Sequence, residues 1–272
     1  MQPLDALLES RPRVLWVGAH PDDESFAGAV LAKASLKCGC PLHFLVLTRG
    51  EGGEFPKPLQ DGRDLGEVRT GELNEVVRLY RATLELEPWF NASLPVESFP
   101  YRHELAARWA ADAGEEPAIR VARTIRTFRP DVVLTFAPEH GATGHPEHQL
   151  ASRFTTAGIR LAADPAAPLE GAPHRVPHTY YFLHRYRGLR LLGMSLDPRE
   201  PTETFDGRQE CAGGRSCFQV MAANTLPHRT QKNDMGLMRL VSRFLRKVYL
   251  YRADPFTELH DAYEEHLVRG MG

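Results

Sequence analysis

Continuous apolar runs along the chain alternate with longer segments in which apolar residues recur at helical spacing. A run such as "VLWVG" is typical of a strand that is buried on both faces of a sheet, because neither face carries polar side chains. Runs of this kind predict strands at residues 14–18, 41–50, 131–138 and 178–185.

The segments between these runs carry apolar residues three and four positions apart, which is the period of an amphipathic helix. This spacing predicts helices at residues 24–36, 65–82, 115–128, from 145 or 146 past 157, at about 231–251 and at 254–268. Residues 83–100 contain Pro88, Pro95 and Pro100 and are predicted to be irregular, since proline lacks the backbone N–H that regular structure uses. Most of 186–230 is predicted to be irregular as well.

The alternation of strands and helices predicts an α/β fold, with a Rossmann-like, mostly parallel sheet that has helices on both faces. We expect a single domain over residues 1–272, made of a core at about 12–185 and a less regular C-terminal extension at about 186–272 packed on it. A chain of 272 residues can bury a sizeable core without disulfides or structural metals.

Composition narrows the class of protein. The net charge of −2 argues against nucleic-acid binding, and 42% hydrophobic with 25% charged residues is typical of a soluble globular protein. No apolar run approaches the ~20 residues of a membrane span, so we expect no stable membrane insertion. The N-terminus lacks the features of a signal peptide, which predicts a cytoplasmic protein. A homo-oligomer is possible on the sequence alone. The sequence also leaves open whether Cys211 and Cys217 form a disulfide, although free thiols are more typical of a cytoplasmic protein.

Two clusters of histidines and carboxylates follow predicted strands. His20, Asp22, Asp23 and Glu24 come directly after the strand at 14–18, and the segment "GHPEH" (144–148) comes shortly after the strand at 131–138. Because ligands bind beyond the carboxyl ends of parallel strands, both clusters are expected at the same edge of the sheet.

Imidazole and carboxylate together are typical ligands of zinc, and a catalytic zinc site takes three protein ligands and leaves one position open. Of two adjacent aspartates, one can bind the metal while the other accepts a proton from water. Alternatively, Asp22 or Asp23 caps the helix that follows, and Glu24 suits its first turn. A cap explains neither His20 nor the second cluster, so the sequence predicts a metal site.

The segments "AHPDDE" (19–24) and "GHPEH" resemble those of the LmbE-like or PIG-L zinc de-N-acetylases, and "LTRGEGGE" and "LGEVRTGEL" are similar to further segments of that family. The resemblance covers residues 12 to about 160. It implies the following roles: zinc ligands His20, Asp23 and His148; general base Asp22; His145 to stabilise the oxyanion or protonate the leaving amine; Glu147 to orient His145; and Arg69 to meet the substrate.

The resemblance also implies an activity. We expect a hydrolase with one Zn²⁺ per chain, or another divalent metal, that removes an N-acetyl group from a small, N-acetylglucosaminyl-type substrate. The chain departs from the family at Thr143, where some sugar deacetylases have a tyrosine, and at Glu147, where aspartate is usual. The substrate's identity therefore stays open, as does acetyl versus a longer acyl group. The alternative function is a metal-dependent hydratase of an unsaturated dicarboxylic acid on the same fold.

Overall fold

A computed structural model describes residues 2–53, 62–93, 102–183, 197, 199–242, 244 and 247–264. The strands are β1 (Val14–Gly18), β2 (Leu42–Thr48), β3 (Thr83–Trp89), β4 (Val132–Phe136), β5 (His178–Phe182), β6 (Glu203–Asp206) and β7 (Lys247–Ala253). The helices are α1 (Leu4–Leu7), α2 (Glu24–Ala32), α3 (Leu65–Leu79), α4 (Arg102–Ala113), α5 (Pro117–Phe128), α6 (Gly141–Gly144), α7 (Pro146–Ala163), α8 (Cys217–Asn224) and α9 (Lys232–Ser242), with short helical turns η1 (Leu8–Ser10) and η2 (Lys33–Lys37).

The strands form one seven-stranded sheet in the order β3-β2-β1-β4-β5-β7-β6. Strands β1 to β5 run parallel, whereas β7 is antiparallel to β5 and β6 is antiparallel to β7. The predicted α/β class with a mostly parallel sheet is confirmed. The chain leaves β1 toward β2 and later places β4 on the other side of β1, so the strand order reverses between β1 and β4. Such a reversal is where open parallel sheets bind ligands.

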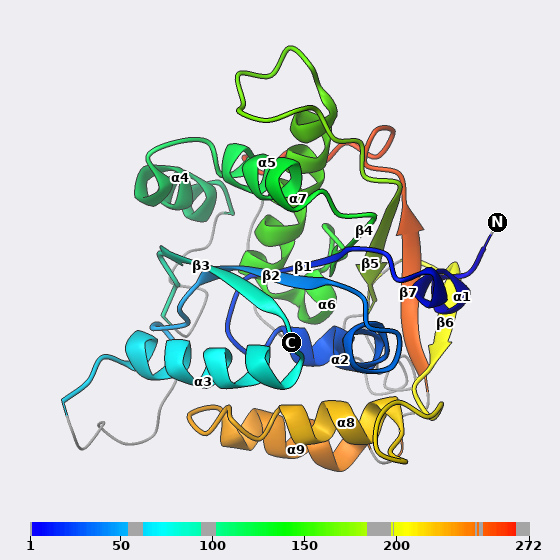
Figure 1. The fold of residues 1–272 in the computed structure, drawn as a ribbon. Helices are drawn as coiled ribbons and strands as arrows, with labels where there is room; N and C mark the ends of the chain where they lie inside the picture. Colours follow the sequence, from blue (N-terminus) through cyan, green and yellow to red (C-terminus); the bar gives the residue numbers. More distant parts are fainter. Residues whose placement is uncertain are drawn as a thin grey trace.

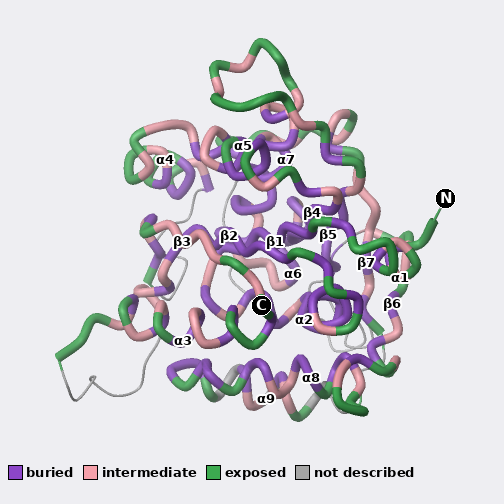
Figure 2. Tube along the Cα trace, viewed as in Figure 1, coloured by how far each residue is buried: buried purple, intermediate pink, exposed green. Residues whose placement is uncertain are grey.

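Helices cover both faces of the sheet (Figure 1): α2 and α3 lie on one face, with α8 and α9 outside them, and α4, α5 and α7 lie on the other. Successive side chains of β1 point to opposite faces of the sheet. Val14 and Trp16 pack in the core on the α2 side, and Leu15 and Val17 pack in the core on the α7 side. The central strands are buried throughout (Figure 2). Within the described ranges, no helix has both the length and the apolar character that crossing a bilayer requires.

The predicted helix over 231–251 is wrong in its second half. The first half is α9, but residues from Lys247 onward form β7 between β5 and β6. Its segment "VYLYR" has aromatic and β-branched residues that favour strands, and Val248 and Leu250 are buried in alternation with Tyr249 and Tyr251. The strand forms because β5 offers backbone hydrogen-bond partners at an otherwise open edge. The tail predicted as helical at 254–268 forms turns rather than a helix over its described part, 254–264, and 265–268 lie outside the described residues.

Two segments predicted to be irregular contain regular elements. Strand β3 lies inside 83–100 as an edge strand whose register against β2 shifts between Leu86 and Trp89, and edge strands and such irregularities are where a sheet tolerates a proline such as Pro88. The C-terminal part contributes β6, and it contributes α8, which begins with a capping box formed by Ser216 and Gln219. The expected C-terminal extension thus adds strands to the central sheet as well as packing on it.

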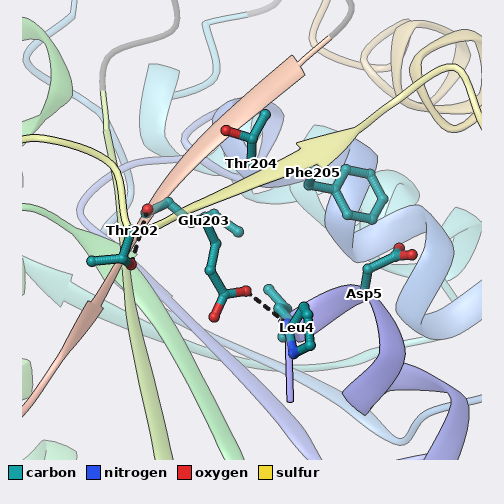
Figure 3. Close-up of a pocket in the computed structure, with 8 residues that line it drawn as sticks. Leu4, Asp5, Thr202, Glu203, Thr204 and Phe205 are labelled. Carbon is teal, nitrogen blue, oxygen red and sulfur yellow. Dashed lines mark hydrogen bonds between the residues drawn. The ribbon is translucent and has the colours of Figure 1, made fainter. Parts of the chain in front are cut away.

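A cavity of about 260 Å³ lies between the N-terminal helix α1 and the edge strand β6, far along the sheet from β1 (Figure 3). The Glu203 carboxylate points across it and accepts a hydrogen bond from the backbone N–H of Leu4 (2.7 Å). This bond ties the N-terminal segment to the edge of the sheet. All four cysteines are buried free thiols, Cys211 and Cys217 included.

Close packing of α2 against α8 depends on a glycine. A Cβ atom at Gly28 would lie 2.4 Å from Cγ of Met221 and 2.9 Å from the hydroxyl of Tyr80, whereas a Cβ at Gly71, on the exposed side of α3, would meet nothing. We expect Gly28→Ala to lower the free energy of unfolding by about 1–3 kcal/mol through overpacking. Gly71→Ala should raise it by about 0.5–1 kcal/mol, since alanine is the better helix former. Urea denaturation of both variants measures this, and shifts of the same sign would contradict the packing shown by the structure.

Candidate metal centre and active site

The two predicted clusters meet at the point where the strand order reverses. His20 to Glu24 lie between the end of β1 and the start of α2, and His145 to His148 lie at the start of α7, after β4. Because β1 and β4 are neighbours, both loops leave the same edge of the sheet. The ring centroids of His145 lie 4.8 Å from those of both His20 and His148. The expectation that the two segments share one edge is therefore met.

Three donor atoms converge from His20, Asp23 and His148. His20 Nδ1 lies 3.2 Å from His148 Nε2 and 3.7 Å from Asp23 Oδ1, and His148 Nε2 lies 3.0 Å from the same Asp23 oxygen. Donor atoms of a tetrahedral zinc ion at ~2.0–2.2 Å are spaced by roughly 3.3–3.6 Å. The observed separations of 3.0, 3.2 and 3.7 Å lie close to that range, so the three side chains fit a divalent metal.

The remaining polar atoms of these side chains are held by other groups. His20 Nε2 contacts Glu147 Oε2 at 2.5 Å, and His148 Nδ1 contacts the carbonyl oxygen of Gly141 at 2.9 Å. Such partners set the tautomer of a metal-binding histidine and leave the other nitrogen for the ion. Gly141 has φ 61°, and a Cβ there would lie 2.7 Å from Cβ of His148, so this close approach requires glycine.

Asp23 does not cap helix α2. Its Oδ2 accepts hydrogen bonds from the backbone N–H groups of Ala19 (2.7 Å) and His20 (2.8 Å), and it makes no side-chain cap to α2. The Oδ1 atom is thereby aimed at the two histidines. The capping alternative considered for this aspartate is wrong, because the loop after β1 uses the carboxylate for its own backbone.

The electrostatics of the cluster favour a positive charge. Burial alone lowers the pKa of His20, but the carboxylates of Asp23 and Glu147 outweigh burial and raise it to about 10. Burial would raise the pKa of Asp23, yet the neighbouring His148 and His20 hold it well below its usual range. A group of donors that stabilises a proton in this way also stabilises a bound cation.

Asp22 has the most unusual backbone in the site. Its φ of 103° lies beyond the left-handed helical values of the other non-glycine residues with positive φ. The residue is half-buried, and burial, with the charge of Asp23 next, raises its pKa to about 8. Asp22 is therefore a carboxyl group that exchanges a proton near neutral pH.

His145 is oriented by its own helix. It is the N-cap of α7, and its Nδ1 accepts a hydrogen bond from the backbone N–H of Glu147 (3.2 Å). Burial, followed by the proximity of His148 and His20, holds the pKa of His145 well below its usual range. The neutral ring therefore carries its proton on Nε2, which can donate a hydrogen bond.

Glu147 supports a different histidine from the one expected. Its Oε2 contacts His20, whereas the same oxygen is 4.0 Å from His145 Nδ1. The carboxylate is completely buried and also accepts from the Asn91 side chain and the Ala92 backbone N–H, both at 2.8 Å. The Glu147 carboxylate therefore supports His20, and Glu147 contacts His145 through its backbone N–H; a role of its side chain in orienting His145 stays a prediction.

Arg69 lies on α3, beside the loop that follows β2. It is buried, and its Nη1 donates to the carbonyl oxygen of Gly50 (2.5 Å) in the loop after β2. The structure thus places Arg69 where it shapes that loop, and the expected contact with a substrate stays a prediction.

The sequence did not point to Asn91 or His228, which both support the site. Asn91 follows β3 and links Glu147 to the loop after β2, where its Oδ1 accepts from the Gly52 backbone N–H (2.7 Å). His228, from the C-terminal part, contacts the buried Glu24 carboxylate at 2.8 Å. The sequence offered only an indirect signal, a further carboxylate directly after a predicted buried strand, since a carboxylate that is buried there requires a partner. Glu24 is thus more than a first-turn residue stabilised by the helix dipole.

The chain is similar to several known proteins over much of its length. The PIG-L family model, described as GlcNAc-PI de-N-acetylase, matches residues 15–159, more than half of the chain. A Thermomonospora curvata protein named 1D-myo-inositol 2-acetamido-2-deoxy-alpha-D-glucopyranoside deacetylase is 37% identical over 221 residues, which are 76% of this chain and 72% of that protein.

Two solved structures share the fold. The N,N'-diacetylchitobiose deacetylase from Pyrococcus horikoshii has a TM-score of 0.63 at 15% identity, covering 93% of this chain and 91% of that chain. The 4-carboxy-2-hydroxymuconate hydratase from Pseudomonas putida has a TM-score of 0.62 at 16% identity, covering 92% and 98%. At such identities the likeness concerns the fold alone.

Proposed function

This chain belongs to the PIG-L family of GlcNAc-PI de-N-acetylases, and on that basis we propose that it is a metal-dependent hydrolase that removes the acetyl group from an N-acetylglucosaminyl-type small molecule. The observation that carries the proposal is the convergence of His20 Nδ1, Asp23 Oδ1 and His148 Nε2 beside Asp22 and His145. The chemistry of an amide hydrolase requires a cation site, a base and a hydrogen-bond donor in one place.

We assign the metal to His20, Asp23 and His148, with zinc as the most suitable ion for two imidazoles and one carboxylate. His145 also has a donor atom within 4.8 Å of donors on His20 and His148, so three histidines form an alternative set. The set with Asp23 is preferred because its carboxylate balances part of the ion's charge. A divalent ion held there supplies Lewis acidity, which polarises the amide carbonyl and acidifies water.

The residues around this site have complementary roles in the proposed reaction. Asp22 accepts the proton of the attacking water, and its raised pKa makes its carboxylate a stronger base than an ordinary aspartate. His145 donates a hydrogen bond from Nε2 to the carbonyl oxygen as negative charge develops there. The departing amine then receives the proton that the Asp22 carboxylic acid took from the water, since the neutral His145 would have to become an imidazolate to supply one. Products are acetate and a free amine.

The decisive experiment offers purified protein the sugar named for the Thermomonospora curvata relative, 1D-myo-inositol 2-acetamido-2-deoxy-alpha-D-glucopyranoside, beside N-acetylglucosamine and its N-propionyl analogue. We expect free primary amine to appear with at least one N-acetyl sugar. Chelation should abolish the release while far-UV circular dichroism stays unchanged, because a core of this size does not depend on a metal. No release by metal-loaded protein would overturn the proposal.

A hydratase remains the alternative on the same fold, since the hydratase noted above resembles this chain in structure. At 16% identity this likeness does not separate the two reactions. The relative at 37% identity is named a deacetylase, and that identity favours the hydrolase.

A further inference from the structure

A segment of the C-terminal part, residues 227–231, contacts the loop that carries Asp22 and Asp23 and the start of α2. His228 is 1% exposed and its Nε2 lies 2.8 Å from Oε1 of Glu24, which is also 1% exposed. Such a fully buried pair of ionisable groups is costly to desolvate unless its geometry is good, so its presence beside the site requires an explanation.

The pair is connected to Asp22 through the second oxygen of Glu24. Oε2 of Glu24 accepts a hydrogen bond from the backbone N–H of Asp22 (3.1 Å). On the other side of the same peptide bond, the carbonyl oxygen of Pro21 accepts from Nε2 of Gln231 (2.8 Å). Side chains therefore hold both polar groups of the Pro21–Asp22 peptide. Glu24 holds the N–H and is itself paired with His228, and Gln231, three residues after His228, holds the carbonyl oxygen.

The segment itself is anchored. The Thr230 backbone N–H (2.9 Å) and hydroxyl (2.7 Å) both donate to the carboxylate of Glu72, a residue of α3 that is 2% exposed. Residues 227–231 are thus anchored to helix α3 through Thr230. A backbone as unusual as that of Asp22 persists only where the surroundings determine it.

We propose that His228 is a positioning residue. Through Glu24, and together with Gln231, it holds the Pro21–Asp22 peptide so that Asp22 keeps its positive φ, and this sets the direction of the Asp22 carboxylate. The inference rests on the proposed role of Asp22 in hydrolysis. Asp23 is held independently, by the backbone N–H groups of Ala19 and His20. The contacts of His228 and Gln231 therefore act on the base Asp22 and leave the metal ligands in place.

The test compares His228→Ala with Arg229→Ala, a matched control whose exposed side chain pairs with Glu75 on the surface. We expect His228→Ala to lower kcat by roughly 10–100-fold with little change in KM, because displacement of a reacting group by about 1 Å can cost 10²-fold. Metal content should stay at the wild-type value. His228→Gln, which keeps a donor near Glu24, should recover part of kcat and covers the case in which the alanine variant does not fold.

Two further measurements separate positioning from general stability. In an Asp22→Asn background, His228→Ala should lower the residual rate no further, since coupled residues are non-additive. An additive loss would overturn the proposal. Amide hydrogen exchange of residues 20–25 in the metal-free protein should speed up in His228→Ala and stay unchanged in Arg229→Ala. Unchanged exchange in both would also overturn it. This arm needs no substrate, so it is decided even if the protein proves not to be a deacetylase.

Discussion

Asp22→Asn is expected to lower kcat by about 10²–10⁴-fold, the usual contribution of a general acid–base group, while the protein keeps its metal. Asparagine has the size of aspartate and tolerates positive φ, so the φ of 103° should survive the change. The amide cannot accept a proton, and this is the property that the experiment removes. Single-turnover rates and elemental analysis of the same samples measure the two effects separately.

The matched control is Asp131→Asn, at the opposite end of the sheet. Asp131 directly precedes β4, and its Oδ2 accepts from the exposed backbone N–H of Arg13 (2.8 Å). This variant should turn over at the wild-type rate. A wild-type rate in Asp22→Asn as well would remove Asp22 from the chemistry and leave another group to be found.

Metal binding should be lost from Asp23→Ala and from His148→Ala. Changing a group that merely supports a ligand typically costs ~10–100-fold in metal affinity, and loss of a ligand itself should cost more. After dialysis we expect about one metal per chain in the wild type and much less in both variants, since a site of this kind holds one ion. Excess zinc should restore part of the activity of Asp23→Ala.

His145→Ala and His174→Ala sharpen this experiment. If Asp23 is the third ligand, His145→Ala keeps the metal and loses activity; if the three histidines are the ligands, His145→Ala loses the metal and Asp23→Ala keeps it. His174→Ala is the neutral control, because its Nε2 contacts the Pro130 carbonyl oxygen before β4, away from the site. Should Asp22→Asn lose the metal while Asp23→Ala retains it, the roles of the two aspartates are reversed.

The contacts within the site differ in how far the sequence could reveal them. That His20 and His148 lie together followed from the strand pattern, since neighbouring parallel strands end at one edge. Which histidine Glu147 supports did not follow, because sequence spacing brings Glu147 near His145 while the turn at the start of α7 directs the carboxylate to His20. The partner of Glu24 was equally hidden, since His228 is separated from it by 204 residues.

The sequence by itself determined the α/β class, the buried strands β1, β2, β4 and β5 and the location of the candidate site, because continuous apolar runs and the residues that follow them are local signals. Tertiary structure alone decided the rest. The segment "VYLYR" became β7 because β5 presented an unpaired edge to it, and the apolar period is ambiguous between strand and helix in so short a stretch. The Pro21–Asp22 peptide is held at its carbonyl oxygen by Gln231, 210 residues away, and at its N–H by Glu24, whose own partner His228 is 204 residues away; such long-range contacts leave no periodic signal in the chain.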